Sequence, residues 1–274
     1  QWKILQQDIS SYLKIEKEEV FCSILPTATQ YSRNAIFAGL MPYAIFDIFP
    51  DLWVFDEDDE GKNMMEKELF EKHLIRAGKK YKFNYEKVSN IRTGKRLAET
   101  VSELMNFDLN IIIYNFVDML SHSRTELEVI QELAKNDRAY RSITLSWFRH
   151  SHLLELIRTL QGSGVKIVFM TDHGSIKVNN PVKVVGDKKT SSNLRYKSGK
   201  NLSYNPKDVF EIRKPEQVHL PKSNITSSYI FATDYDYLVY PNNYNHFVQY
   251  YRNTYQHGGV SMEEMILPLI TTQA

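Results

Sequence analysis

Short apolar runs alternate with amphipathic stretches along this chain. Runs rich in β-branched residues predict buried strands at residues 20–25, 109–116 and 165–171. Before the third run, apolar residues recur at helical spacing and predict one long helix over residues 137–160. Near-continuous apolar strands separated by helices are typical of a parallel sheet covered on both faces. We therefore expect an α/β fold with a mostly parallel central sheet flanked by helices.

Two charged or polar segments interrupt this pattern. Residues 53–97 are charged and predict a helical insertion that begins with an acidic surface turn, DEDDEG. Residues 176–224 are polar and contain several prolines, which predicts a lid-like insertion over the active-site face. Its basic residues could steer an anionic substrate, but a solvated, mobile loop is the favoured interpretation. These residues include Lys188, Lys189, Arg195, Lys197 and Lys200.

Length, composition and charge narrow the class of protein. The 274 residues suffice for one large α/β domain or two small ones. A net charge of +1 gives no global attraction for nucleic acid or an acidic membrane. The single cysteine, Cys22, falls in an expected buried strand and cannot form an internal disulfide. With no long apolar run, we expect a soluble, cytoplasmic protein without membrane contact. The chain starts inside a helical pattern with no preceding strand, so we expect a piece of a longer protein.

Polar side chains follow each expected strand, and a histidine precedes the last two glycines. They are Thr27 and Thr29, Asp118 and His122, Asp172 and His173, and His257. In open α/β sheets, chemistry collects beyond the carboxyl ends of the strands. Each pair taken alone is more often a helix cap or an ordinary polar residue. Together they offer the oxygen and nitrogen ligands that zinc accepts, in numbers that suit a two-metal site.

A hydroxyl beside such metals becomes a usable nucleophile, because a metal stabilises the alkoxide as it does a bound hydroxide. The helix that begins near Thr29 would add partial positive charge and free N–H donors suited to a phosphate. The sequence therefore favours a phosphoryl-transfer site.

Four motifs, in order along the chain, resemble those of the alkaline phosphatase superfamily: PTATQYSRNAIFAGLMP, VDMLSH, TDHG and QHGGVSMEEMILPL. The first is similar to the nucleophile segment of the nucleotide pyrophosphatase/phosphodiesterase members. Thr29 falls on the nucleophile, and Gly39, Leu40 and Pro42 close the helix. SRNAIFAGLMP and NFVDMLSHSRTE look like the PglZ branch, and closest to the output domain of PorX-type response regulators. The resemblance implies one alkaline phosphatase-like domain over residues 1–274.

The resemblance also implies two zinc ions. The implied ligands are Asp118, His122 and His257 for one ion, and Asp172, His173 and Thr29 for the other. A further superfamily ligand, an Asp after the first strand, has no counterpart and would fall just before Gln1. We therefore expect weaker occupancy of the second site. Zinc is favoured over manganese by the His-rich first site.

The residues after the nucleophile depart from the superfamily pattern. Many relatives have an Asn three residues later, touching the phosphate, where this chain has Ser32, followed by Arg33 and Asn34. These residues are candidates for substrate binding. Arg33 could clamp the phosphate by charge-assisted hydrogen bonds, or it could equally lie on the helix surface.

The resemblance implies a zinc-dependent phosphodiesterase or phosphatase acting on diesters such as linear or cyclic oligonucleotides. In PorX-type proteins a receiver domain precedes this domain, and the family is tied to type IX secretion in Bacteroidetes. The domain would then be the output of a two-component response regulator. The alternative is a regulatory interaction module that binds a partner such as a sigma factor, with a structural or ligand-sensing metal. Formation of a homodimer stays open.

Overall fold

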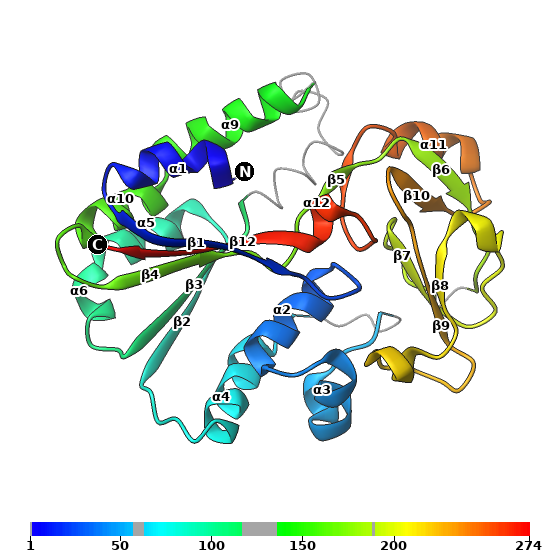
Figure 1. The fold of residues 1–274 in the computed structure, drawn as a ribbon, viewed down its shortest axis with the longest axis horizontal. Coiled ribbons are helices and arrows are strands. Elements are labelled where there is room, and N and C mark those ends of the chain that lie inside the picture. Colours follow the sequence, from blue (N-terminus) through cyan, green and yellow to red (C-terminus); the bar gives the residue numbers. More distant parts are fainter. Residues whose placement is uncertain (1, 57–62, 117–135, 188–189) are drawn as a thin grey trace. The chain divides into compact units, whose positions relative to one another are not determined.

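The computed structural model describes residues 2–56, 63–116, 136–187 and 190–274. The chain divides into two compact units. The first unit contains Gln1–Val20, Lys80–Met170 and Pro268–Ala274, and the second contains Phe21–Lys79 and Thr171–Leu267. Both mix helices with strands (Figure 1), so the expected α/β class is confirmed.

The first unit is built on strands that come from distant parts of the sequence. They are β1 (Lys14–Cys22), β2 (Phe83–Val88), β3 (Leu109–Tyr114), β4 (Lys166–Met170) and β12 (Ile266–Gln273). β2 and β3 run parallel. The other sheet has the order β1-β12-β4, and β12 runs antiparallel to β4. The closing strand thus adds an antiparallel pair to the expected parallel arrangement.

Helices pack apolar side chains against the strands of the first unit. They are α1 (Trp2–Ser10), α5 (Ile91–Glu99), α6 (Val101–Leu104), α9 (Asp137–Arg149) and α10 (His152–Leu160). α1, α9 and α10 lie over one face of β1-β12-β4 (Figure 1), where Ile9, Phe148 and Ile157 are buried together. A second cluster joins α5, α6 and α10 to β3. These two clusters form the core of the first unit.

Three expectations for these regions are wrong in detail. The helix predicted over residues 137–160 is two helices, because the chain leaves helical geometry before Ser151, whose hydroxyl caps α10. The segment 53–97 contains a strand, β2, as well as helices. Cys22 is exposed rather than buried.

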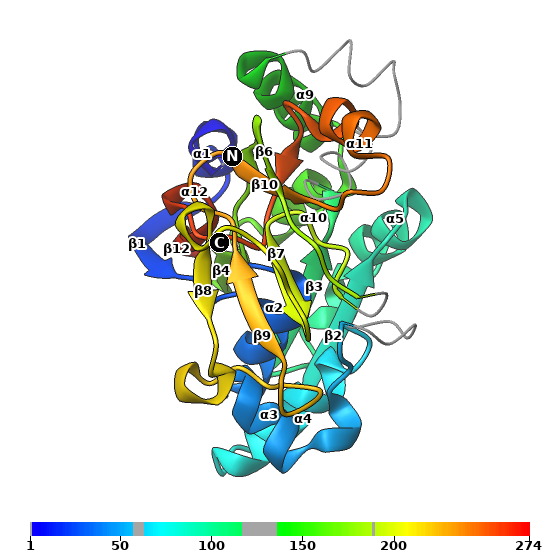
Figure 2. The same ribbon diagram turned by 90° about the vertical axis from the view of Figure 1, so that its right-hand side faces the viewer.

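The second unit carries shorter elements. Its helices are α2 (Thr29–Ala38), α3 (Pro42–Ile48), η1 (Pro50–Leu52), α4 (Glu66–Arg76), η2 (Pro206–Asp208), η3 (Pro215–Val218), α11 (Tyr244–Tyr251) and α12 (Met262–Met265). Its strands are β5 (Ile176–Lys177), β6 (Asn180–Lys183), β7 (Tyr196–Gly199), β8 (Phe210–Ile212), β9 (Ser228–Phe231), β10 (Asp236–Val239) and β11 (Tyr255–Gln256). Figure 2 shows the antiparallel β7-β9-β8 sheet, with the β10-β6 pair nearby.

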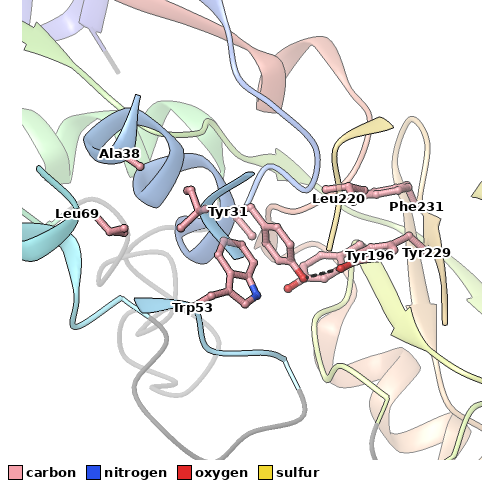
Figure 3. Close-up of a cluster of buried hydrophobic side chains, with 10 residues drawn as sticks. Tyr31, Ala38, Trp53, Leu69, Tyr196, Leu220, Tyr229 and Phe231 are labelled. Atoms are coloured by element: carbon pink, nitrogen blue, oxygen red, sulfur yellow. Dashed lines mark hydrogen bonds between the residues drawn. The ribbon is translucent and has the colours of Figure 1, made fainter. Parts of the chain in front are cut away.

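An aromatic cluster fixes α2 against this sheet (Figure 3). The Tyr31 ring packs edge-on against Trp53, Tyr196 and Tyr229, with ring centroids 5.4, 5.8 and 6.2 Å away. Edge-to-face pairs of this kind contribute beyond the area they bury. Tyr31 and Tyr196 each donate a 2.8 Å hydrogen bond to Asp56. Asp56 is therefore a half-buried anchor and not part of a purely exposed acidic turn.

The segment 176–224 also differs from the expected mobile loop. Arg195 and Lys197 are 0% and 1% exposed, so neither can steer a substrate from solvent. Lys188 and Lys189 lie outside the described residues.

α2 ends where Gly39 adopts a left-handed conformation, with φ of 59°. No helix in the described part of the chain is both long and apolar enough to cross a membrane.

Candidate active site

The two threonines before α2 have different environments. The buried Thr27 hydroxyl donates to the Gly259 carbonyl at 3.0 Å and accepts from the Gly258 N–H at 2.9 Å. Thr29 is the first residue of α2, and its Oγ1 lies 3.1 Å from His173 Nε2. Thr27 therefore ties two loops together, whereas Thr29 faces a titratable side chain at a helix amino terminus.

Two imidazoles are fixed in the same way. His173 Nδ1 lies 2.9 Å from the Gly174 carbonyl, and His257 Nδ1 lies 3.1 Å from the Thr27 carbonyl. Because a carbonyl can only accept, each Nδ1 carries a hydrogen, and Nε2 is the ring nitrogen left for other partners. The two rings stack with centroids 3.8 Å apart and an interplanar angle of 13°. A carbonyl on Nδ1 is the usual partner of a histidine that binds metal through Nε2.

Asp172 is a buried carboxylate held by a cation. Its Oδ2 accepts a 3.0 Å hydrogen bond from Arg33 Nε, and Arg33 Nη1 also lies 3.5 Å from Glu66 Oε1. Burial alone would raise the pKa of Asp172, but nearby His173 and Arg33 outweigh it and lower the pKa below its ordinary value. Asp172 is therefore an anion.

Glycines bring the site loops close to neighbouring backbone. A Cβ atom on Gly174 would lie 1.9 Å from the Glu263 carbonyl oxygen. A Cβ atom on Gly259 would lie 2.6 Å from the Ala232 carbonyl oxygen. The glycines of TDHG and QHGG are thus required by close backbone approach.

The QHGG turn rests on a buried ion pair. Arg195 Nη2 lies 2.7 Å from Glu264 Oε2, and both side chains are 0% exposed. Glu264 Oε1 accepts from the Gly259 N–H at 2.9 Å, and Glu264 Oε2 accepts from the Ser261 hydroxyl at 2.7 Å. The Ser-x-x-Glu spacing could have revealed the role of Glu264 as part of a capping box. Nothing in the sequence pattern pointed to Arg195 as its partner.

The three candidate substrate-binding residues have separate roles. The Ser32 hydroxyl donates to the Ala28 carbonyl one turn back, and its side chain is 2% exposed. Asn34 is equally buried. Arg33 is 13% exposed by its side chain, so it is not a surface residue of α2. Arg33 is bonded to a predicted metal ligand, Asp172.

The donor atoms at this site suit a divalent metal. Asp118 and His122 lie outside the described residues. Within the described ranges, no group of three or more His, Cys, Asp or Glu side chains is placed to hold a metal ion. The structure does bring together four of the predicted ligands, directly or through neighbouring contacts: Thr29, Asp172, His173 and His257. Two imidazoles with carbonyl-bound Nδ1, a carboxylate and a hydroxyl fit zinc chemistry.

Comparisons with known proteins show the family and the fold of this chain. Residues 1–272 match the family described as the BREX system PglZ alkaline phosphatase-like domain. Among solved structures, the chain is similar to phosphonoacetate hydrolase from Sinorhizobium meliloti 1021, crystallised with phosphonoformate. That match has a TM-score of 0.54 and 12% identity, and covers 97% of this chain and 83% of the other. At this identity the likeness shows the fold alone. No curated protein matches the sequence.

Proposed function

Because this chain belongs to the PglZ alkaline phosphatase-like domain family, we propose that it is a metal-dependent phosphoester hydrolase with Thr29 as its nucleophile. The observation that carries the proposal is the 3.1 Å contact between Thr29 Oγ1 and His173 Nε2 at the start of α2. A hydroxyl at a helix amino terminus, beside an imidazole nitrogen that could bind the same metal ion, is placed to attack a bound phosphate.

The chain's own residues divide the work. Thr29 Oγ1 gives up its proton to solvent and bonds to phosphorus, while the bond from phosphorus to the leaving alcohol breaks and that oxygen takes up a proton. Water later hydrolyses the bond between phosphorus and Thr29. The amino terminus of α2 favours the negative phosphate. Asp172, His173 and Thr29 would hold one zinc ion. Asp118, His122 and His257 would hold the other. Bound zinc would lower the pKa of the hydroxyl and offset charge on the phosphate oxygens.

The resemblance supports a class of substrate and a regulatory role for this proposed enzyme. The nucleophile segment, similar to that of pyrophosphatase/phosphodiesterase proteins, supports diesters, including linear or cyclic oligonucleotides. The PorX-like motifs support a role as the output domain of a response regulator.

Replacing the nucleophile tests the proposal. Thr29→Ala should lower hydrolysis of a chromogenic phosphodiester by at least about a thousandfold, because the attacking oxygen is gone. Thr159→Ala removes an exposed helical threonine and should retain wild-type rates. A chelator should abolish wild-type activity, and added zinc should restore it.

Two outcomes would contradict the proposal. Diester and monoester hydrolysis that persists in Thr29→Ala would remove its role as nucleophile. A zinc-loaded wild-type protein that turns over neither class would favour the interaction module, with a partner such as a sigma factor.

A further inference from the structure

Glu66 is a buried carboxylate that belongs to none of the sequence motifs. It is the first residue of α4 and is 0% exposed. α4 packs against α2, where Leu69 and Ala38 share a core cluster. This packing brings Glu66 Oε1 to 3.5 Å from Arg33 Nη1. Burying a carboxylate costs free energy unless a cation lies close to it, and Arg33 supplies that cation to Glu66.

Arg33 joins Glu66 to the candidate metal site. Its Nε donates to Asp172 Oδ2 at 3.0 Å, and the exposed fractions of the Arg33 and Asp172 side chains are only 13% and 9%. The Arg33 guanidinium therefore lies between two buried carboxylates, those of Glu66 and Asp172.

The charge of Glu66 gives it an effect on the metal site. With Asp172 and Arg33 alone, the pair would be neutral and would attract a divalent cation weakly. Adding the Glu66 carboxylate leaves the three side chains with one net negative charge. In a buried site this charge is poorly screened by solvent, so it acts on a cation bound at Asp172.

We infer that Glu66 is a positioning residue for the metal site, acting through Arg33 by balancing its charge beside Asp172. The inference rests on the proposed function, because it concerns the same site. Partners of ligating carboxylates typically change metal affinity by about 10- to 100-fold when they are replaced.

Neutralising Glu66 gives the first test. Glu66→Gln keeps the shape of the side chain and removes its charge. Zinc affinity at the site of Asp172, His173 and Thr29 should therefore fall about 10- to 100-fold. The measurement is a titration of the full chain with zinc against a competing chelator, with circular dichroism to confirm the fold. Glu68→Gln makes the same charge change at an exposed position of α4 and should leave zinc affinity unchanged.

A second variant separates charge from packing. Glu66→Gln combined with Arg33→Gln removes both charges and leaves Asp172 with its own negative charge. Zinc affinity should return to within about threefold of wild type, a difference of less than 1 kcal/mol. Arg33→Gln alone should bind zinc no more weakly than wild type. A purely structural role for Glu66 would instead make the double variant bind at least as weakly as Glu66→Gln.

The outcomes distinguish this inference from the proposed function. If the wild-type chain binds no zinc, the proposed function fails and the inference fails with it. If the wild type binds zinc and folded Glu66→Gln binds it equally well, only the role of Glu66 is overturned. Failure of the double variant to recover affinity would likewise overturn the charge argument alone.

Discussion

Lys197 places a cation inside the second unit without a close carboxylate among the described residues. Its side chain is 1% exposed, and its ammonium lies 4.2 Å from the centre of the Tyr240 ring. Burial lowers the pKa of Lys197 to about 7, against the opposing attraction of Asp56. Folding therefore costs free energy whenever this side chain must be charged, because water solvates an ammonium better than the interior does.

Replacing Lys197 should stabilise the protein in a pH-dependent way. Lys197→Met should raise the free energy of unfolding by about 1–4 kcal/mol below pH 7, where the buried lysine is charged. Between pH 7 and 10.5 the unfolded chain holds this proton and the folded chain does not, so wild-type stability rises and the advantage shrinks. Urea titrations across this range give the measurement.

Lys200→Met is the matched control for this change, because Lys200 is exposed. It should show no such pH dependence. An advantage for Lys197→Met that grows as the pH rises would contradict the assigned cost of burying the charge.

Among the elements, α9 and α10 show how one residue sets a boundary. Apolar residues keep nearly the same spacing through residues 137–160, so periodicity alone predicts a continuous helix. The Ser151 hydroxyl instead accepts from the Leu154 N–H at 3.3 Å and donates to the Phe148 carbonyl at 2.7 Å. Ser151 therefore caps the first turn of α10 and donates a hydrogen bond to a carbonyl in the last turn of α9.

Removing this cap should weaken the first unit. Ser151→Ala should lower the free energy of unfolding by about 1 kcal/mol, because a helix N–H loses its acceptor. Ser151→Asp keeps an oxygen acceptor at the helix start and should stay close to wild type. Urea titrations of the three proteins compare them directly. Equal losses in both variants would show that packing, and not the cap, holds the boundary.

At the scale of the whole molecule, the buried ion pair of Arg195 with Glu264 joins segments that are separated in the sequence. Arg195 bonds to Glu264 and to the carbonyls of Thr233 and Asp236, while Glu264 also accepts from the Gly259 N–H. Arg195→Met should lower the free energy of unfolding by about 3–5 kcal/mol, because it leaves a buried carboxylate without its cation.

The double variant Arg195→Met with Glu264→Gln should lose less stability, because no buried charge is left unpaired. Thermal unfolding of both variants beside wild type measures the difference. A double variant that is less stable than Arg195→Met would show that Glu264 contributes mainly through its other hydrogen bonds.

The sequence predicts those parts of the molecule that rest on local pattern. Apolar runs marked β3 and β4, and the PglZ resemblance is confirmed by the family match. The strand β2, with sequence FNYEKV, lacks an apolar run and was missed. Ion pairs such as Arg195 with Glu264 leave no periodic signal, since 69 residues separate the partners. The roles of Thr29, Asp172, His173 and His257 stay predictions, although the structure brings these residues together.

Thr27 makes the motion of the nucleophile and of one imidazole interdependent. Its hydroxyl bonds to Gly258 and Gly259, and its carbonyl accepts from His257. Thr27 therefore holds together two chain segments separated by 230 positions. A shift of the segment that precedes Thr29 must carry His257 with it.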